Sequence, residues 1–131
     1  MHYDTIDASR TARVVTWLKG PVEIAFAIAP DHAPVRDNVS DSGDEEFDRN
    51  TENAILARLH EGDEWAWCTV RCQVRWNQWT ADDHLGMCSY KDWEDFKQNG
   101  YYEDMIAECL LQLRKELTQM KNTLNRDFSN G

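Results

Sequence analysis

The stretch from Trp65 to Tyr90 constrains the fold more than any other part of the chain. Its sequence, WAWCTVRCQVRWNQWTADDHLGMCSY, alternates apolar and polar residues in two runs that meet at Asn77-Gln78. Alternation with a period of two is typical of a half-buried strand, and a short polar pair between two such runs predicts a β-hairpin. We therefore expect an antiparallel sheet built around this hairpin.

A turn at Asn77-Gln78 determines the register of the two predicted strands, with Trp76 opposite Trp79. The further expected pairs are Val74 with Ala81, Val70 with Leu85 and Cys68 with Met87. One face of the first strand is then apolar and consists of Ala66, Cys68, Val70, Cys72, Val74 and Trp76. The other face carries Trp65, Trp67, Arg71, Gln73 and Arg75, opposite Asp82, His84, Cys88 and Tyr90. A slip of one residue would exchange the two faces.

A second apolar segment, VEIAFAIA at residues 22–29, alternates bulky and small side chains. This pattern predicts a central strand whose small face accepts a close neighbour. The preceding residues, TARVVTWLKG, are ambiguous. Their β-branched residues favour a strand, whereas a cap at Asp7 or Ser9 and a stop at Gly20-Pro21 would favour a helix. We favour the strand, joined to the next one by a turn at residues 19–21.

Three helices are predicted after these strands. DEEFDRNTENAILARLHEG, residues 44–62, begins with acids, ends at a glycine, and spaces four apolar residues at helical intervals: Phe47, Ala54, Ile55 and Leu59. Ser89 followed by Asp92 predicts the start of a short helix, KDWEDFKQ, that ends at Asn99-Gly100. The last helix has an apolar stripe formed by Tyr102, Met105, Ile106, Cys109, Leu110, Leu113, Leu117, Met120 and Leu124.

These elements predict an α+β fold: a three- to four-stranded antiparallel sheet with a central β-hairpin, packed by two main helices and a short one. A length of 131 residues fits a single domain, residues 1–131. Within it we expect an acidic loop at residues 30–43 and a frayed tail at residues 125–131. The stripe of the last helix would serve a homodimer as well as a core.

The charge of the chain is strongly acidic and unevenly distributed. The formal net charge is −10 at pH 7, so nucleic acid would be repelled and direct binding to it is not expected. Residues 31–52 and residues 82–108 each carry a net charge of −6, whereas residues 114–131 carry +2. Two acidic segments can imitate the spaced phosphates of a nucleic acid and attract a basic partner. The alternative is that the acidity only confers solubility.

The sequence predicts neither a membrane segment nor a targeting signal. The longest apolar run, around residues 25–29, is far shorter than the roughly 20 residues that a membrane span needs. The first ten residues, MHYDTIDASR, match neither a secretory signal nor a transit peptide. We therefore expect a soluble protein of the cytoplasm, in which four unevenly spaced cysteines stay reduced and mostly buried.

No group of residues predicts catalysis or metal binding. Cys68 and Cys72, like His84 and Cys88, lie four residues apart on a predicted strand. At roughly 3.3 Å per residue this is about 13 Å, too far for a shared metal. GxSxG, Walker-type and HExxH motifs do not occur. We therefore predict no catalytic residue, metal or cofactor, and an enzyme that uses Cys88 or His84 remains an alternative.

The tryptophans of the hairpin have different expected roles. Trp76 and Trp79 flank the turn and are expected to pack across it. Trp65 and Trp67 lie on the polar face, either beneath a helix or exposed as anchors of an interface. A base-stacking platform is not expected, because the neighbouring arginines belong to a strongly acidic chain.

The stretches GDEWAWCTVRCQVRW, DDHLGMCSY and DFKQNGYYEDMIAECLLQL resemble small acidic accessory proteins of unassigned function found in phages and prophages. The resemblance covers about residues 62–113. It implies a phage-encoded accessory protein of the anti-CRISPR kind, which inhibits host defence by imitating nucleic acid. No functional residue is carried over from this resemblance.

The sequence therefore predicts a non-enzymatic protein that binds and inhibits a basic, nucleic-acid-handling complex in the cytoplasm of a host bacterium. The expected partner contacts are acidic, with three aromatic anchors: Asp41, Asp44, Glu45, Glu46, Asp48, Asp82, Asp83, Glu94 and Asp95, with Trp65, Trp67 and Tyr90. The alternative is a protein that sequesters a small anionic or aromatic molecule, such as a nucleotide, in a pocket lined by Trp65, Trp67, Arg71, Arg75, His84 and Tyr90.

Overall fold

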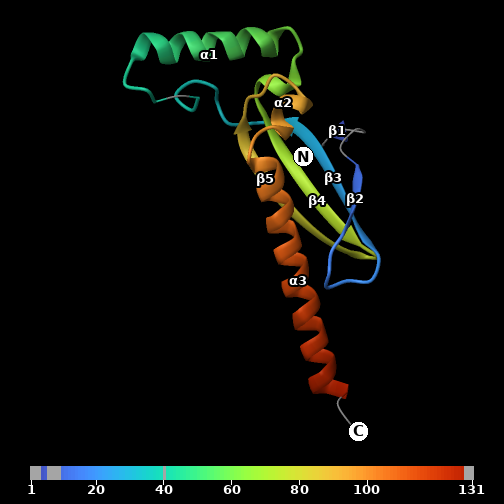
Figure 1. Ribbon diagram of the computed structural model, residues 1–131. Helices are drawn as coiled ribbons and strands as arrows, with labels where there is room; N and C mark the ends of the chain where they lie inside the picture. The colour runs from blue at the N-terminus through green and yellow to red at the C-terminus, as the bar shows by residue number, and fades with distance from the viewer. Residues whose placement is uncertain (1–3, 6–9, 40, 129–131) are drawn as a thin grey trace.

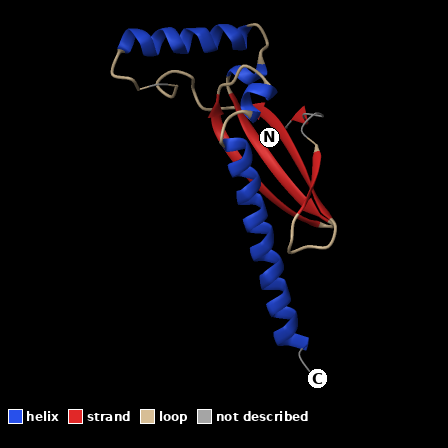
Figure 2. Ribbon diagram, viewed as in Figure 1, coloured by secondary structure: helices blue, strands red, loops and turns tan. Residues whose placement is uncertain are grey.

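The structure, a computed structural model, describes residues 4–5, 10–39 and 41–128. Along the chain the elements are β1 (Asp4–Thr5), β2 (Thr11–Val14), β3 (Pro21–Pro30), α1 (Glu45–His60), η2 (Glu64–Ala66), β4 (Cys68–Trp76), β5 (Trp79–Cys88), α2 (Trp93–Lys97) and α3 (Tyr101–Phe128). All strand pairs are antiparallel, and α1, although it lies between β3 and β4 in the chain, does not connect parallel strands, so the expected α+β class is confirmed (Figures 1 and 2).

β3 and β4 form the centre of the sheet, and β5 forms one edge. β1 and β2 both pair with the other edge of β3, at residues 27–28 and 21–24 respectively. The sheet is therefore four strands wide. The central position of residues 22–29 and the strand at residues 11–14 are confirmed. The alternative caps, Asp7 and Ser9, lie outside the described residues.

The hairpin of β4 and β5 has the expected turn, and its register is correct along most of its length. Asn77 adopts a positive φ of 55° at the turn, and Trp76 pairs with Trp79. Beyond Val70, however, a β-bulge shifts the register, so that Cys68 lies opposite Cys88 and not opposite Met87. The expected Cys68 pair is therefore wrong by one residue, because alternation alone does not reveal an extra residue in one strand.

The main core lies between one face of the sheet and α3 (Figure 2). The bulky residues of β3 and four residues of the predicted β4 face, Cys68, Val70, Cys72 and Val74, are buried there against Met105, Ile106, Cys109 and Leu113 of α3. The other two predicted residues of that face differ: Trp76 is only partly buried, and Ala66 lies in η2 within a second, smaller cluster. Met120 and Leu124 continue the stripe but are exposed, because α3 extends past the end of the sheet (Figure 1). The helix continues to Phe128, past residue 125 where we expect fraying to begin, and residues 129–131 lie outside the described residues.

α1 does not pack on the sheet as expected. It lies across the top of the molecule, with its N-terminal end away from the other elements (Figure 1). Its only strongly apolar positions near the body are Ile55 and Leu59, which join a second, small cluster with Val35, Ala66 and Trp67. Because so few residues can be buried, only the C-terminal half of α1 is anchored. We call residues 44–60 the arm.

Local capping residues explain where the helices begin and end. The Asp44 carboxylate accepts hydrogen bonds from the N–H groups of Glu46 and Phe47, and Gly62, with φ of 87°, follows the C-cap of α1. α2 begins after Asp92, whose carboxylate accepts from the Asp95 N–H. The expected capping residue Ser89 lies upstream of this helix, so the cap is Asp92 itself.

Candidate partner-binding surface

The free end of the arm carries a cluster of acidic residues, which we call the acidic tip: Asp41, Asp44, Glu45, Glu46 and Asp48. Asp44 is the helix cap, and Asp48 accepts hydrogen bonds from the Ser42 N–H and, at 2.8 Å, from the Ser42 hydroxyl. These two carboxylates therefore hold the start of the helix to the preceding loop.

The other three acids of the tip have no such structural role. Asp41, Glu45 and Glu46 are exposed, and their carboxylates make no hydrogen bond or ion pair with the part of the chain that the structure describes. Beside them, Phe47 is 55% exposed, although its spacing predicted a buried position. An exposed aromatic ring among free carboxylates is typical of a binding surface, in which an apolar anchor is surrounded by a polar rim.

Glu52 connects the arm to the loop that precedes it. Its carboxylate accepts hydrogen bonds from the Asp37 N–H at 2.9 Å and from the Arg36 guanidinium at 3.0 Å. The Asp37 N–H and the Arg36 side chain together lower the pKa of Glu52, against the opposing effect of desolvation. The arm is thus attached to the loop by a charged contact as well as by the small apolar cluster.

The remaining predicted acidic contacts do not join the tip. Asp82 is exposed opposite Gln73, whereas Asp83 is half-buried opposite Cys72, so the two carboxylates lie on different faces of the sheet. In α2, Glu94 forms an ion pair with Lys97 at 3.0 Å. The other acid there, Asp95, accepts a hydrogen bond from the Lys91 N–H. Both lie on α2, apart from the free end of α1 (Figure 1).

The structure decides between the two positions that the sequence left open for Trp65 and Trp67. Trp67 is only 3% exposed, in the cluster beneath α1, and its indole N–H donates to the Ala33 carbonyl at 2.8 Å. Trp65 packs against Trp93 and Phe96, with ring centroids 6.4 and 6.0 Å apart. Trp67 is therefore an interior residue, and the half-buried Trp65 packs against the main core beside α2.

Tyr90, the third predicted anchor, is also partly buried. Its ring packs edge-on against Phe96, with the centroids 5.2 Å apart. Desolvation raises the pKa of its phenol, with smaller contributions from neighbouring acidic groups. Its backbone carbonyl accepts a hydrogen bond from Arg58 at 2.6 Å. Tyr90 therefore links the core to the arm.

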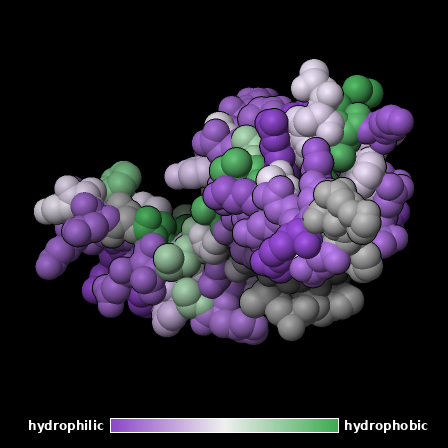
Figure 3. Space-filling model, turned by 90° about the horizontal axis from the view of Figure 1, so that it is seen from below, coloured by the Kyte–Doolittle hydropathy of each residue, from purple (hydrophilic) through white to green (hydrophobic). Residues whose placement is uncertain are grey.

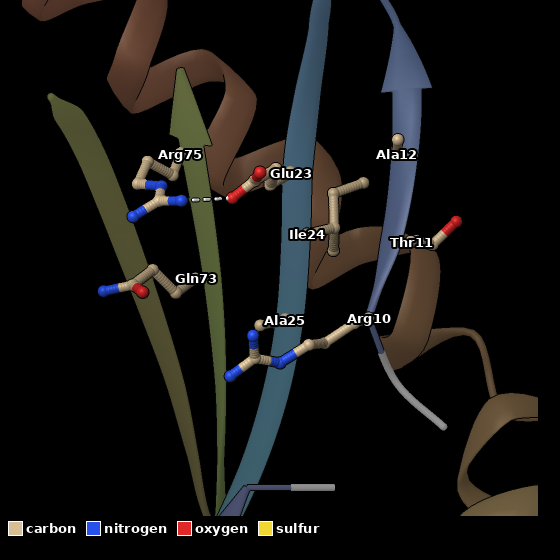
Figure 4. A pocket seen from close by; sticks show the side chains of 8 residues that line it. All are labelled: Arg10, Thr11, Ala12, Glu23, Ile24, Ala25, Gln73 and Arg75. Carbon is tan, nitrogen blue, oxygen red and sulfur yellow. Dashed lines mark hydrogen bonds and ion pairs between the residues drawn. The ribbon is translucent and has the colours of Figure 1, made fainter. Parts of the chain in front are cut away.

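The alternative ligand pocket is not assembled. A shallow hollow of about 500 Å³ lies over β2, β3 and β4, and of the six predicted residues only Arg75 lines it. Figure 4 shows Arg10 reaching across β3 past Ala25, and Arg75 turned towards Glu23, with which it forms an ion pair at 2.6 Å. The other predicted lining residues lie elsewhere, with Trp67 and Tyr90 below the arm.

The residues considered for catalysis are separated by the sheet. Cys88 is buried in the core opposite Cys68, whereas His84 is exposed and pairs in register with Arg71. Burial raises the pKa of the Cys88 thiol to about 11 and that of Cys68 to about 12. Thiols in this environment stay protonated at neutral pH and are poor nucleophiles. Among the described residues, no three or more His, Cys, Asp or Glu side chains form a group suited to a metal ion.

A groove between the arm and the body was not foreseen from the sequence. It has a volume of about 540 Å³ and is lined by α1, the end of β5, the segment that follows it and the start of α3. Met87 and Tyr101, which line it, are 50% and 49% exposed. In Figure 3 the arm stands out from the body, and hydrophobic atoms, in green, are visible where the two join. A β-bulge near the end of a strand changes the direction in which the neighbouring side chains point.

No family model, curated protein or solved structure matches the chain. Among the described residues, no helix combines the length and the apolar character that crossing a membrane requires.

Proposed function

We propose that this protein is a non-enzymatic binding protein that uses the acidic tip of its arm to occupy a basic, nucleic-acid-handling surface of a partner complex. The resemblance of residues 62–113 to phage accessory proteins supports a bacterial defence complex as the partner, inhibited in the host cytoplasm. Binding would exclude nucleic acid from the occupied surface, both by filling it and by neutralising its charge.

The observation that carries this proposal is the exposure of the tip. Asp41, Glu45 and Glu46 point into solvent without internal partners among the described residues, and the exposed Phe47 ring lies next to them in sequence. Carboxylates at spaced positions attract a basic surface and accelerate association with it, while a desolvated aromatic ring slows dissociation. Acidity that served solubility alone would not require an exposed apolar ring next to the acids in sequence.

The proposal is tested by reversing the charge of the three free acids with Asp41→Lys, Glu45→Lys and Glu46→Lys in one variant. Tagged wild type and variant are used to capture partners from nuclease-treated lysates of bacteria that carry defence complexes, and bound proteins are identified by mass spectrometry. We expect a stoichiometric partner with the wild type and none with the variant, because each reversed charge now repels the basic surface.

A matched control carries Glu108→Lys, Glu116→Lys and Asp127→Lys, exposed acids of α3 that produce the same change in net charge. This control is expected to retain the partner. Reversal in the first turn of α1 opposes the helix dipole by about 0.3–1 kcal/mol per residue, so circular dichroism must show that both variants are folded. Equal capture by wild type and tip variant, with both folded, would contradict the proposed role of the tip.

A further inference from the structure

The groove beneath the arm has the form of a receptor for an apolar segment. Its walls carry small residues where a segment would approach, with Thr51 and Ala54 on α1 and Gly86 on β5. Larger apolar side chains stand at its margin, half-exposed, in Met87 and Tyr101. A helix can bind with one face in a groove when the side chains of the walls are small and larger apolar side chains flank the opening.

Phe47 lies in the acidic first turn, on the face of α1 that lines the groove. It lies four residues before Thr51 and seven before Ala54, so these residues share one face of α1. On α1 the groove begins at Thr51, just after the acidic tip, and runs along the arm to Arg58 at its anchored end. An occupant would meet carboxylates at one end and an apolar surface along the rest.

Fixed contacts hold the groove open. The Arg58 guanidinium donates from Nε to Asp63 at 2.8 Å and from Nη2 to the Tyr90 carbonyl at 2.6 Å, which ties α1 to the segment after β5. On the opposite wall, the Asp31 carboxylate accepts the Met87 N–H at 2.6 Å. Preorganised walls reduce the entropic cost of binding.

The charges of the groove restrict its occupant. Arg58 is the one cationic residue among those that line it, and its guanidinium is already engaged by Asp63 and Tyr90. The chain carries a net charge of −10, and Asp48, the last acid of the tip, lies three residues before Thr51 on the same helix. An acidic occupant would therefore be repelled, whereas lysines or arginines beside an apolar face would be attracted.

We infer that this groove binds an amphipathic helix of the partner, whose apolar face fills the space between α1 and β5 and whose basic residues contact the acidic tip. The inference rests on the proposed function and specifies what the partner presents: a basic amphipathic helix beside its nucleic-acid-handling surface. Apolar side chains at positions i, i+3, i+4 and i+7 of that helix would enter the groove.

The probe for this inference is a labelled amphipathic peptide of leucine and lysine, with the leucines at helical spacing, measured by fluorescence anisotropy. A peptide of the same composition in scrambled order controls for charge, and a leucine–glutamate peptide controls for sign. We expect the wild type to bind the amphipathic peptide at least about tenfold more tightly than either control peptide. Only the amphipathic peptide combines an apolar helix face with positive charge.

Two variants test the groove directly. Ala54→Trp fills it and is expected to weaken peptide binding about tenfold or more, because the apolar face can no longer enter. Met87→Ala removes a half-exposed apolar side chain from the margin and is expected to weaken binding several-fold. Leu111→Ala removes a side chain of similar exposure, 48%, from α3 outside the groove and is expected to change nothing. Circular dichroism and thermal unfolding verify that each variant is folded.

The outcomes separate this inference from the proposed function. If folded Ala54→Trp binds the peptide as well as the wild type while the tip variant loses it, the groove is not the site and the acidic tip still is. If Ala54→Trp abolishes binding while the tip variant retains it, the groove stands and the role of the tip fails. Equal binding of the scrambled peptide, or none by the wild type, overturns the inference. So does a dimer in sedimentation that Ala54→Trp converts to monomer, because a second copy would then occupy the groove.

Discussion

Met87 adopts a backbone conformation that residues with side chains usually avoid. Its φ of 54° lies in the left-handed region, which is costly for a residue with a side chain. Asp31 stabilises this conformation by accepting the Met87 N–H, and it also accepts the Thr69 hydroxyl at 2.9 Å and the Ala33 N–H at 2.8 Å. A side chain at Gly86 would stand 3.2 Å from the same carboxylate, so glycine leaves room for it.

Replacing Met87 tests whether its backbone is strained. We expect Met87→Gly to be more stable than Met87→Ala by about 1 kcal/mol, because glycine adopts a positive φ without steric cost and alanine does not. Urea unfolding followed by circular dichroism gives both free energies of unfolding. If the alanine variant is as stable as the glycine variant, the left-handed conformation is not held in the folded protein.

Asp31→Asn tests the carboxylate that holds this bulge. Burial raises the pKa of Asp31, but hydrogen bonds from Met87, Ala33 and Thr69 together outweigh it and leave the pKa below its usual value. A depressed carboxyl pKa stabilises the fold above the unfolded-state value of about 3.9, and this contribution is lost as the pH falls through the folded-state pKa.

We therefore expect Asp31→Asn to lower the free energy of unfolding by about 1 kcal/mol at pH 7. The difference from the wild type should shrink in acid, as the wild-type carboxyl becomes protonated. Denaturation curves measured from pH 7 down to about pH 3 provide the comparison. A difference that stays constant over this range would show that the charge of Asp31 does not matter.

At the scale of elements, α3 and α1 differ in how much of each helix is anchored. The first half of α3 packs across the sheet, and its later turns extend past it. In α1 the anchored half is the C-terminal one, through Ile55 and Leu59, and the acidic half projects. In both helices the free part is where the apolar stripe no longer meets a neighbouring element.

Two leucine-to-alanine substitutions compare the packed half of α3 with its free half. Leu113 is fully buried and Leu124 is 47% exposed, eleven residues further along the same stripe. We expect Leu113→Ala to lower the free energy of unfolding by about 2–5 kcal/mol and Leu124→Ala by less than about 0.5 kcal/mol. Comparable losses, dependent on protein concentration, would instead indicate that a second chain covers the end of the helix.

Much of the architecture can be predicted from the spacing of apolar and polar residues that are close together in the sequence. Alternation and the turn at Asn77-Gln78 predict the hairpin, and the spacing of Ile106 to Leu117 predicts the face of α3 that packs on the sheet. Sequence patterns do not predict the structure where one strand contains an extra residue or where only half of a helix packs against the body. The bulge at Met87 depends on Asp31, distant in sequence, and the position of α1 depends on which of its few apolar residues find partners.

The candidate surface was predicted only in part, for a related reason. The acids at residues 41–48 were identified from their grouping, and all of them except the half-buried Asp48 are exposed. The aromatic anchors were misplaced because Trp67 is covered by α1, a long-range contact that periodicity does not contain. The exposure of Phe47 could have been predicted, because it is a single aromatic residue in the acidic first turn of the helix.

At the scale of the whole molecule, charge is separated along its length. The acidic tip lies at the free end of α1 at the top of the view, and the far half of α3, where residues 114–128 carry a net charge of +2, runs down to the other end of the molecule (Figure 1). Such a separation orients the molecule in the field of a basic partner, so that the tip approaches first. Encounter rate, more than final affinity, is the quantity that this arrangement affects.

We therefore expect added salt to slow association with the partner by about tenfold or more between low and high ionic strength, with a smaller effect on dissociation. Surface plasmon resonance on the captured partner measures both rates. The tip variant should associate slowly at every salt concentration. An association rate that is independent of salt for the wild type would contradict electrostatic steering by the tip.

The most direct test of the central claim is competition between this protein and nucleic acid for the captured partner. The wild type is titrated into the partner bound to fluorescently labelled DNA, and release of the DNA is measured by anisotropy, with the tip variant and the α3 control in parallel. We expect release by the wild type and by the control but not by the tip variant. A partner that holds DNA and the wild-type protein at the same time, with neither weakening the other, would contradict the claim that the acidic tip occupies the nucleic-acid surface.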